Sequence, residues 1–105
     1  SVEQARFLAN AAFEGFEPVD IALDRAGIGA LLRDAGGRQM VLRRHGAAWV
    51  ARLLDERTEA QLDRDFLTIG TGESTFGTVT LHLGEAAGVW AAGLRRLPQT
   101  GAKHA

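Results

Sequence analysis

The chain has 105 residues, of which 46% are hydrophobic and 24% charged, a composition typical of one globular domain. Its formal net charge is -1, so we expect no bulk attraction to nucleic acid or to anionic membranes. No cysteine is present, which excludes disulfides, thiolate catalysis and cysteine-based zinc sites.

Targeting and membrane segments are not evident in the sequence. No apolar run approaches the ~20 residues that a membrane-spanning helix needs. The N-terminus lacks a basic segment followed by an apolar one, so we expect no signal peptide and a cytoplasmic location. The first residue is Ser1 rather than Met, which is compatible with a piece of a longer protein. We expect one α+β domain over residues 1–98 and a flexible C-terminal tail over residues 99–105.

Residues 1–13 are predicted to form a helix. Ser1 and Gln4 have the spacing of a capping box, and apolar residues then recur at steps of three and four. Gly15 and Pro18 are expected to end this helix.

Residues 19–34 allow two interpretations. Apolar and polar residues alternate over residues 19–24, which favours a strand, whereas Pro18 could open a helix that runs to Gly36. Gly27 and Gly29 disfavour the helix, since each glycine costs about 1 kcal/mol in a helix interior. We therefore prefer two strands, over residues 19–24 and 29–34.

Two glycine turns fix the register of the next hairpins. A loop over residues 35–37 places Ala30 opposite Leu42, and a loop at residues 46–47 places Leu42 opposite Ala51. One sheet face then collects the apolar residues Ala30, Leu32, Met40, Leu42, Trp49, Ala51 and Leu53. At its rim, Asp34, Arg38 and Asp55 are expected to form a cross-strand ladder of charges.

The later elements are predicted to be a short helix, a hairpin and a closing helix. Thr58 and Gln61 have capping-box spacing, so a short helix is expected over residues 56–64. Residues 66–71 and 76–83 are predicted to pair as a hairpin with Leu67 opposite Leu81. Residues 85–97 are predicted to form the closing helix, with a strand through residues 89–94 as the alternative.

Trp49 and Trp90 are expected to meet in one core, because each lies on an apolar stripe. Helix 1–13 would cover the same core. The predicted fold is therefore an antiparallel β-meander sheet of about six strands packed with an N-terminal and a C-terminal helix.

No catalytic, cofactor or metal residue is predicted, so a non-enzyme is preferred, with an enzymatic domain kept as the alternative. The glycine-rich segment over residues 70–75 lacks the lysine of a phosphate-binding loop, so it is interpreted as a hairpin turn. The three histidines His45, His82 and His104 fall on different elements, whereas a metal site needs convergent ligands. Ser74 has no assigned base.

The best candidates for a working surface are the basic residues on the second face of the predicted sheet, namely Arg33, Arg43, His45 and Arg52. Leu31, Val41, Val50 and Leu54 interleave with these residues, so either a helix or a partner must cover part of the face. We interpret the domain as a protein-interaction or regulatory module that binds an acidic protein segment there.

Two other functions compete with this interpretation. One is a small-ligand-binding or enzymatic domain with a pocket between the sheet and the helix over residues 85–97. The other is a structural subunit whose homodimer buries Val41 and Val50.

The order of elements over residues 19–97, with Trp90 in the closing helix, resembles a pleckstrin-homology-like domain. This resemblance implies two antiparallel sheet portions capped by a C-terminal helix. The leading helix 1–13 and the count of about six strands depart from that pattern, and no lipid-binding residue can be carried over. The α+β pattern also resembles short secretion-chaperone-like folds.

Overall fold

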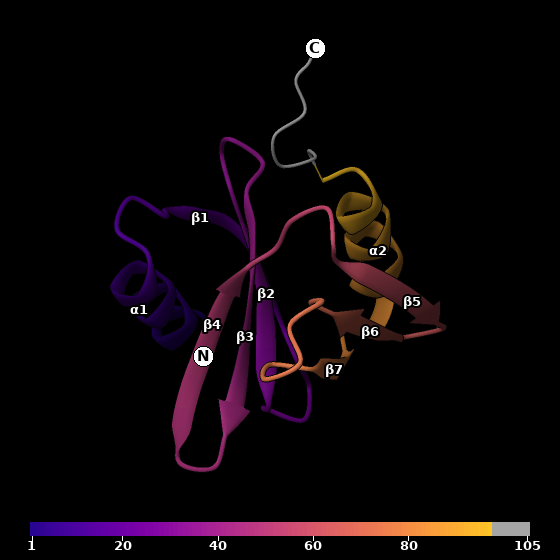
Figure 1. Ribbon diagram of the computed structural model, residues 1–105, viewed down its shortest axis with the longest axis horizontal. Coiled ribbons are helices and arrows are strands. Elements are labelled where there is room, and N and C mark those ends of the chain that lie inside the picture. Colours follow the sequence, from indigo (N-terminus) through magenta and orange to yellow (C-terminus); the bar gives the residue numbers. More distant parts are fainter. Residues whose placement is uncertain (98–105) are drawn as a thin grey trace.

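Two antiparallel sheets and two helices make up the α+β fold, and the computed structural model describes residues 1–97 (Figure 1). The first sheet contains, in this order, β1 (Pro18–Leu23), β2 (Gly29–Asp34), β3 (Gln39–His45) and β4 (Ala48–Leu53). The second contains β5 (Glu59–Asp63), β6 (Phe66–Gly70) and β7 (Thr78–His82). Helix α1 (Val2–Ala12) precedes the sheets, and a 3₁₀ turn (Gly84–Ala86) leads into α2 (Ala87–Arg95).

The α+β prediction with a helix at each end is confirmed, although seven strands in two sheets replace about six in one. The preference for two strands over a helix within residues 19–34 is also confirmed. Within residues 1–97, no helix is long and apolar enough to cross a bilayer. The predicted tail, residues 99–105, lies outside the described residues.

Helix α1 begins where the capping box predicts. The hydroxyl of Ser1 accepts a hydrogen bond from the backbone N–H of Gln4 at 3.1 Å. Ala5 and Ala9 are the buried residues of the helix, and their small side chains let it pack closely on the first sheet. Phe16, in the connection to β1, is fully buried in the same cluster.

The predicted registers of the first sheet are confirmed. Ala30 lies opposite Leu42, and Leu42 opposite Ala51. Gly37 and Gly46 adopt φ values of 91° and 64°, which other residues rarely tolerate. The predicted apolar face packs against α1, and four of its residues are buried, namely Ala30, Leu32, Met40 and Leu42.

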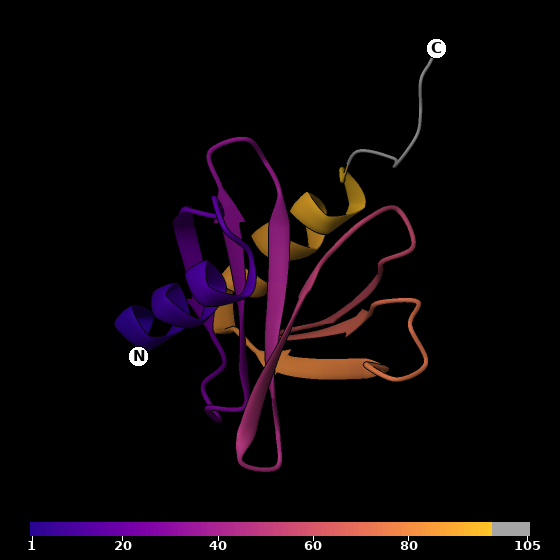
Figure 2. The same ribbon diagram turned by 60° about the vertical axis from the view of Figure 1, so that its left-hand side comes forward.

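The second face of this sheet is also covered, because the second sheet and α2 pack on the side opposite α1 (Figure 2). Leu31 and Val41 are fully buried there, together with Leu67 and Leu81 of the second sheet. The sequence analysis requires either a helix or a partner to cover part of this face, and the second sheet and α2 of the chain itself cover it.

The prediction that Trp49 and Trp90 share one core is wrong. Trp49 packs against the cluster beneath α1, whereas Trp90 packs against the cluster between the two sheets and α2. The error follows from placing all strands in one sheet, since a first sheet buried on both faces separates the two tryptophans.

The predicted helix over residues 56–64 is also wrong, since β5 occupies Glu59–Asp63. The capping-box residue Thr58 instead closes a turn, in which its hydroxyl accepts a hydrogen bond from the N–H of Asp55 at 3.2 Å. β5 then pairs with β6 through a tight turn in which Arg64 adopts a φ of 57°, a position usually held by glycine.

The last hairpin and the closing helix follow the prediction. Leu67 lies opposite Leu81, and Ile69 opposite Val79. Helix α2 forms in place of the alternative strand, and it buries Ala87, Ala91 and Leu94.

Candidate functional site

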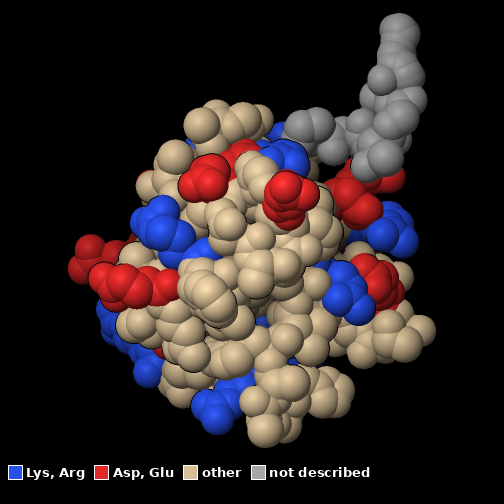
Figure 3. Space-filling model, turned by 90° about the vertical axis from the view of Figure 1, so that its left-hand side faces the viewer, with Lys and Arg blue, Asp and Glu red and all other residues tan. Residues whose placement is uncertain are grey.

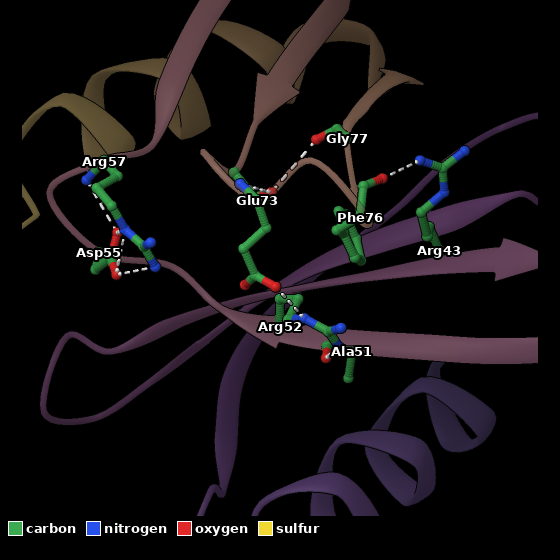
Figure 4. A network of polar contacts seen from close by, with 9 residues as sticks. Arg43, Ala51, Arg52, Asp55, Arg57, Glu73, Phe76 and Gly77 are labelled. Carbon is green, nitrogen blue, oxygen red and sulfur yellow. Dashed lines mark hydrogen bonds and ion pairs between the residues drawn. The ribbon is translucent and has the colours of Figure 1, made fainter.

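Arg43 and Arg52, two of the predicted partner-binding residues, contact the loop between β6 and β7 (Figure 4). Arg43 Nη1 donates hydrogen bonds to the carbonyl oxygens of Phe76 at 2.9 Å and Thr78 at 3.2 Å. Arg52 Nε forms an ion pair with Glu73 Oε1 at 3.0 Å. Both guanidinium groups also lie over the ring of Phe76, 5.5 and 5.6 Å from its centroid. These two arginines therefore hold the second sheet on the first.

The other two predicted residues lie elsewhere. Arg33 forms an ion pair with Asp20, its cross-strand neighbour on β1. Arg43 lies opposite Gly29, four residues along β2 from Arg33, which corresponds to roughly 13 Å. His45 is exposed at the end of β3, and its side chain forms no hydrogen bond or ion pair within residues 1–97. The structure thus joins Arg43 and Arg52 but separates them from Arg33. That the four residues bind an acidic partner stays a prediction.

The charge distribution on the α1 side of the molecule is mixed. Basic and acidic side chains alternate around a broad uncharged centre on this face (Figure 3). The alternative homodimer is expected to bury Val41 and Val50. Val41 is fully buried inside the chain, and Val50 is half-buried and packs against the cluster between the two sheets, so neither residue presents an open apolar face.

A pocket of about 530 Å³ lies between the first sheet and α2. From the strands it is lined by Asp20 and Ile21 of β1, Arg33 of β2 and Gln39 of β3. From the helical side it is lined by Val89, Trp90, Gly93 and Arg96. A second pocket, beneath α1, has only about 90 Å³. The larger pocket falls in the 300–1,000 Å³ range that is usual for small-molecule sites.

Helical spacing and a glycine shape the α2 wall of this pocket. Val89, Gly93 and Arg96 follow one another at steps of four and three, so they lie along one side of the helix. A Cβ atom at Gly93 would lie 3.3 Å from Gln39 Nε2, which is tighter than ordinary contact. Glycine at this position therefore lets the helix approach the amide of Gln39.

Gln39 carries an unusual polar group. Its side chain is only 3% exposed, yet Oε1 accepts no hydrogen bond from any described residue. Buried polar groups almost always have a partner in folded proteins, so an amide oxygen that is closed off from solvent and unpartnered beside a pocket needs an explanation. Rotation of the amide by 180° exchanges its oxygen and nitrogen, so the group can present either an acceptor or a donor.

The charged groups of the pocket differ in their freedom to bind. Asp20 and Arg33 neutralise each other as an ion pair across β1 and β2. Arg96 is exposed, and its side chain makes no hydrogen bond or ion pair with the rest of the described chain. Within residues 1–97, no group therefore competes with a bound molecule for Arg96.

Trp90 provides the aromatic part of the wall. It is half-buried and packs against the cluster between the sheets, and it also lines the pocket. Its indole N–H donates no hydrogen bond to residues 1–97. The pocket therefore combines an aromatic surface, an amide and a guanidinium group that pairs with no residue of the described range 1–97.

Within the described part of the chain, no three histidine or acidic side chains are placed to hold a metal ion. Comparisons with protein-family models, curated proteins and solved structures find no match to this chain. The chemistry of the site is therefore interpreted from its own residues.

A pocket between the sheet and the C-terminal helix was the alternative interpretation of the sequence, but the residues that line it were not identified. Its residues are spread from Asp20 to Arg96, and only Arg33 was among the candidates. Gln39 precedes the apolar core residues Met40, Val41 and Leu42 of β3, and only the structure shows that its amide is buried and unpartnered.

Proposed function

We propose that this domain binds a small molecule in the pocket between the first sheet and α2. A volume of about 530 Å³, a concave shape and a mixed polar and apolar lining support this proposal. The strands supply one wall and the helix the other, so both walls are held by regular structure.

The amide of Gln39 is the observation that carries the proposal. Leaving a buried acceptor without a partner costs about 1–3 kcal/mol. An apolar side chain of the same size would avoid that cost, and every neighbouring core residue of β3 from Met40 to Leu42 is apolar. A bound molecule toward which the Gln39 side chain turns its amide offers a reason for retaining it.

The contacts of the arginines support this proposal over the basic-face interpretation. Arg43 and Arg52 are already engaged by the loop that contains Glu73 and Phe76. A partner would have to compete with those internal contacts. Arg96 and Gln39 face no such competition from the described residues.

A fragment screen by NMR tests the proposal. The ¹⁵N-labelled protein is exposed to a library of small neutral, anionic and cationic compounds, and chemical-shift changes are mapped on the sequence. We expect the hits to perturb Gln39, Trp90 and Gly93 together. A library that yields no hit, or hits that map only to other surfaces, would contradict the proposal.

Two matched variants separate pocket binding from effects on the fold. Val89 and Arg95 are both exposed positions of α2, but only Val89 lines the pocket. Val89→Trp should obstruct the pocket and abolish binding of the fragments, whereas Arg95→Trp should leave it unchanged. Equal binding by both variants would place the fragments outside the pocket.

A further inference from the structure

The charges that line the pocket are unequal. Two arginines and one aspartate line it, which gives a formal charge of +1. Because Asp20 and Arg33 form an ion pair, the excess positive charge belongs to Arg96. A guanidinium group binds carboxylates through two parallel hydrogen bonds, so a carboxylate matches the Arg96 side chain well.

Arginine at this place has an ordinary alternative role. A positive side chain near the C-terminus of a helix interacts favourably with the helix dipole. Arg95, the last residue of α2, can serve that role without lining the pocket. The two adjacent arginines therefore form a natural pair, one inside the pocket and one outside it.

The other walls suit a flat apolar ring. Trp90 offers an aromatic surface, and stacked aromatic pairs are stabilised beyond the effect of the buried area. Ile21 and Val89 add aliphatic surface on opposite walls. A planar ring system between them would leave its polar end toward Arg96 or Gln39.

We infer that the pocket selects small planar organic carboxylates, with Arg96 binding the carboxylate and Trp90 stacking on the ring. This inference rests on the proposed function, since it names the ligand class of the same pocket. It adds that negative charge on the ligand, and not only its shape, determines binding.

Two ligands of nearly equal shape test the role of charge. The probes are 2-naphthoate and its uncharged amide, 2-naphthamide. The readout is the indole N–H resonance of each tryptophan in ¹H–¹⁵N spectra, assigned with the Trp49→Phe and Trp90→Phe variants. The chain has two tryptophans, and only Trp90 lines the larger pocket, so Trp49 is an internal control.

We expect 2-naphthoate to shift the Trp90 resonance and leave that of Trp49 in place. Its affinity should exceed that of 2-naphthamide by about tenfold, the lower end of what a hydrogen bond to a charged group supplies. Arg96→Gln should remove that difference, whereas Arg95→Gln should keep it. Circular dichroism of both variants checks that α2 remains folded.

The possible failures are distinguishable. If both probes shift Trp90 with equal affinity, or if Arg95→Gln weakens naphthoate as much as Arg96→Gln does, the ligand class is wrong and the pocket still binds. If naphthoate fails to shift Trp90 while neutral fragments do, the ligand class is again wrong. If no compound of either experiment perturbs the pocket residues, both the inference and the proposed function fail.

Discussion

Replacing Gln39 by methionine should stabilise the protein. The amide oxygen is buried without a partner among residues 1–97, and such a group costs about 1–3 kcal/mol. Methionine has a similar length and no group that requires a hydrogen bond, and its flexible side chain adapts to the space beside Gly93. We expect the free energy of unfolding to rise by about 1–2 kcal/mol, after allowance for imperfect packing.

Urea unfolding followed by tryptophan fluorescence measures this change, and thermal unfolding should agree with it. For a domain of this size, 1 kcal/mol corresponds to a change in Tm of about 4–8 °C. Gln39→Ala is the control, because it removes the same acceptor but also loses buried CH₂ groups, each of which contributes about 0.8 kcal/mol. Gln39→Met should therefore be the more stable of the two variants.

A methionine variant that is clearly less stable than the original protein would show that the buried amide does not destabilise the fold. The amide would then form hydrogen bonds in solution that stabilise the fold, and its presence in the wall would need no ligand. If the methionine variant is more stable and also loses fragment binding, stability and function oppose each other at this residue.

Three further predictions concern the fold. Leu81→Ala should lower the free energy of unfolding by about 2–5 kcal/mol in chemical denaturation, because Leu81 is fully buried between the sheets. The control, Val89→Ala, changes a position that is 74% exposed and should alter stability by less than about 0.5 kcal/mol. Similar effects of the two variants would contradict the placement of Leu81 in the core. Gly29→Ala should destabilise the protein by about 1–3 kcal/mol or more, because the new Cβ would lie 2.5 Å from the carbonyl oxygen of Leu42. The control, Gly88→Ala, meets no atom within 4 Å and should stabilise α2 by up to about 1 kcal/mol. An unchanged Tm for Gly29→Ala would contradict the close approach of β2 and β3. Burial raises the pKa of Asp34, but the hydrogen bonds and charge of Arg38 together lower it more, so this pKa lies below its ordinary value of 3.8. Because the folded-state pKa is the lower one, Asp34 stabilises the fold above the unfolded-state pKa, and this contribution is lost as the pH falls through the folded-state pKa. The Tm should therefore fall as the pH drops below about 4, and it should fall less steeply in the Asp34→Asn variant. Parallel pH profiles for the two proteins would contradict a stabilising role of the ion pair between Asp34 and Arg38.

Local turn chemistry determined how much of the first sheet the sequence could predict. Glycine-containing loops set the pairing of β2 with β3 and of β3 with β4, and an alternating pattern of side chains then assigned each residue to a face. The register of β6 and β7 followed from matching aliphatic residues across the hairpin. These features depend on residues that are close in the chain.

Features that depend on distant contacts were missed. β5 has one strongly apolar residue, Leu62, and a turn without glycine, so its strand form depends on pairing with β6. The predicted ladder of Asp34, Arg38 and Asp55 is only partly formed, since Asp34 pairs with Arg38 while Asp55 pairs with Arg57 in the following turn. Where the second sheet covers the first could not be deduced from periodicity, because alternation alone does not tell a solvent-exposed face from one that another sheet covers.

The place of the candidate site, between the sheet and the C-terminal helix, appeared only as an alternative interpretation, and its residues were not predicted. Its walls come from three strands and a helix that only the packing of the two sheets brings together. Arg33 appeared in the sequence analysis as part of a basic face, but its neighbours in the pocket, Gln39 and Arg96, gave no local pattern. A buried glutamine becomes informative only when its lack of a hydrogen-bond partner is known.

A crystal structure of the protein grown with 2-naphthoate would show directly whether the pocket binds a planar carboxylate. We expect the ligand to lie between the first sheet and α2, with its ring against Trp90, its carboxylate on Arg96 and the amide of Gln39 hydrogen-bonded to it or to a water that it holds in place. A naphthoate molecule found only elsewhere on the protein, or a pocket closed by movement of α2 onto β3, would rule out this binding mode.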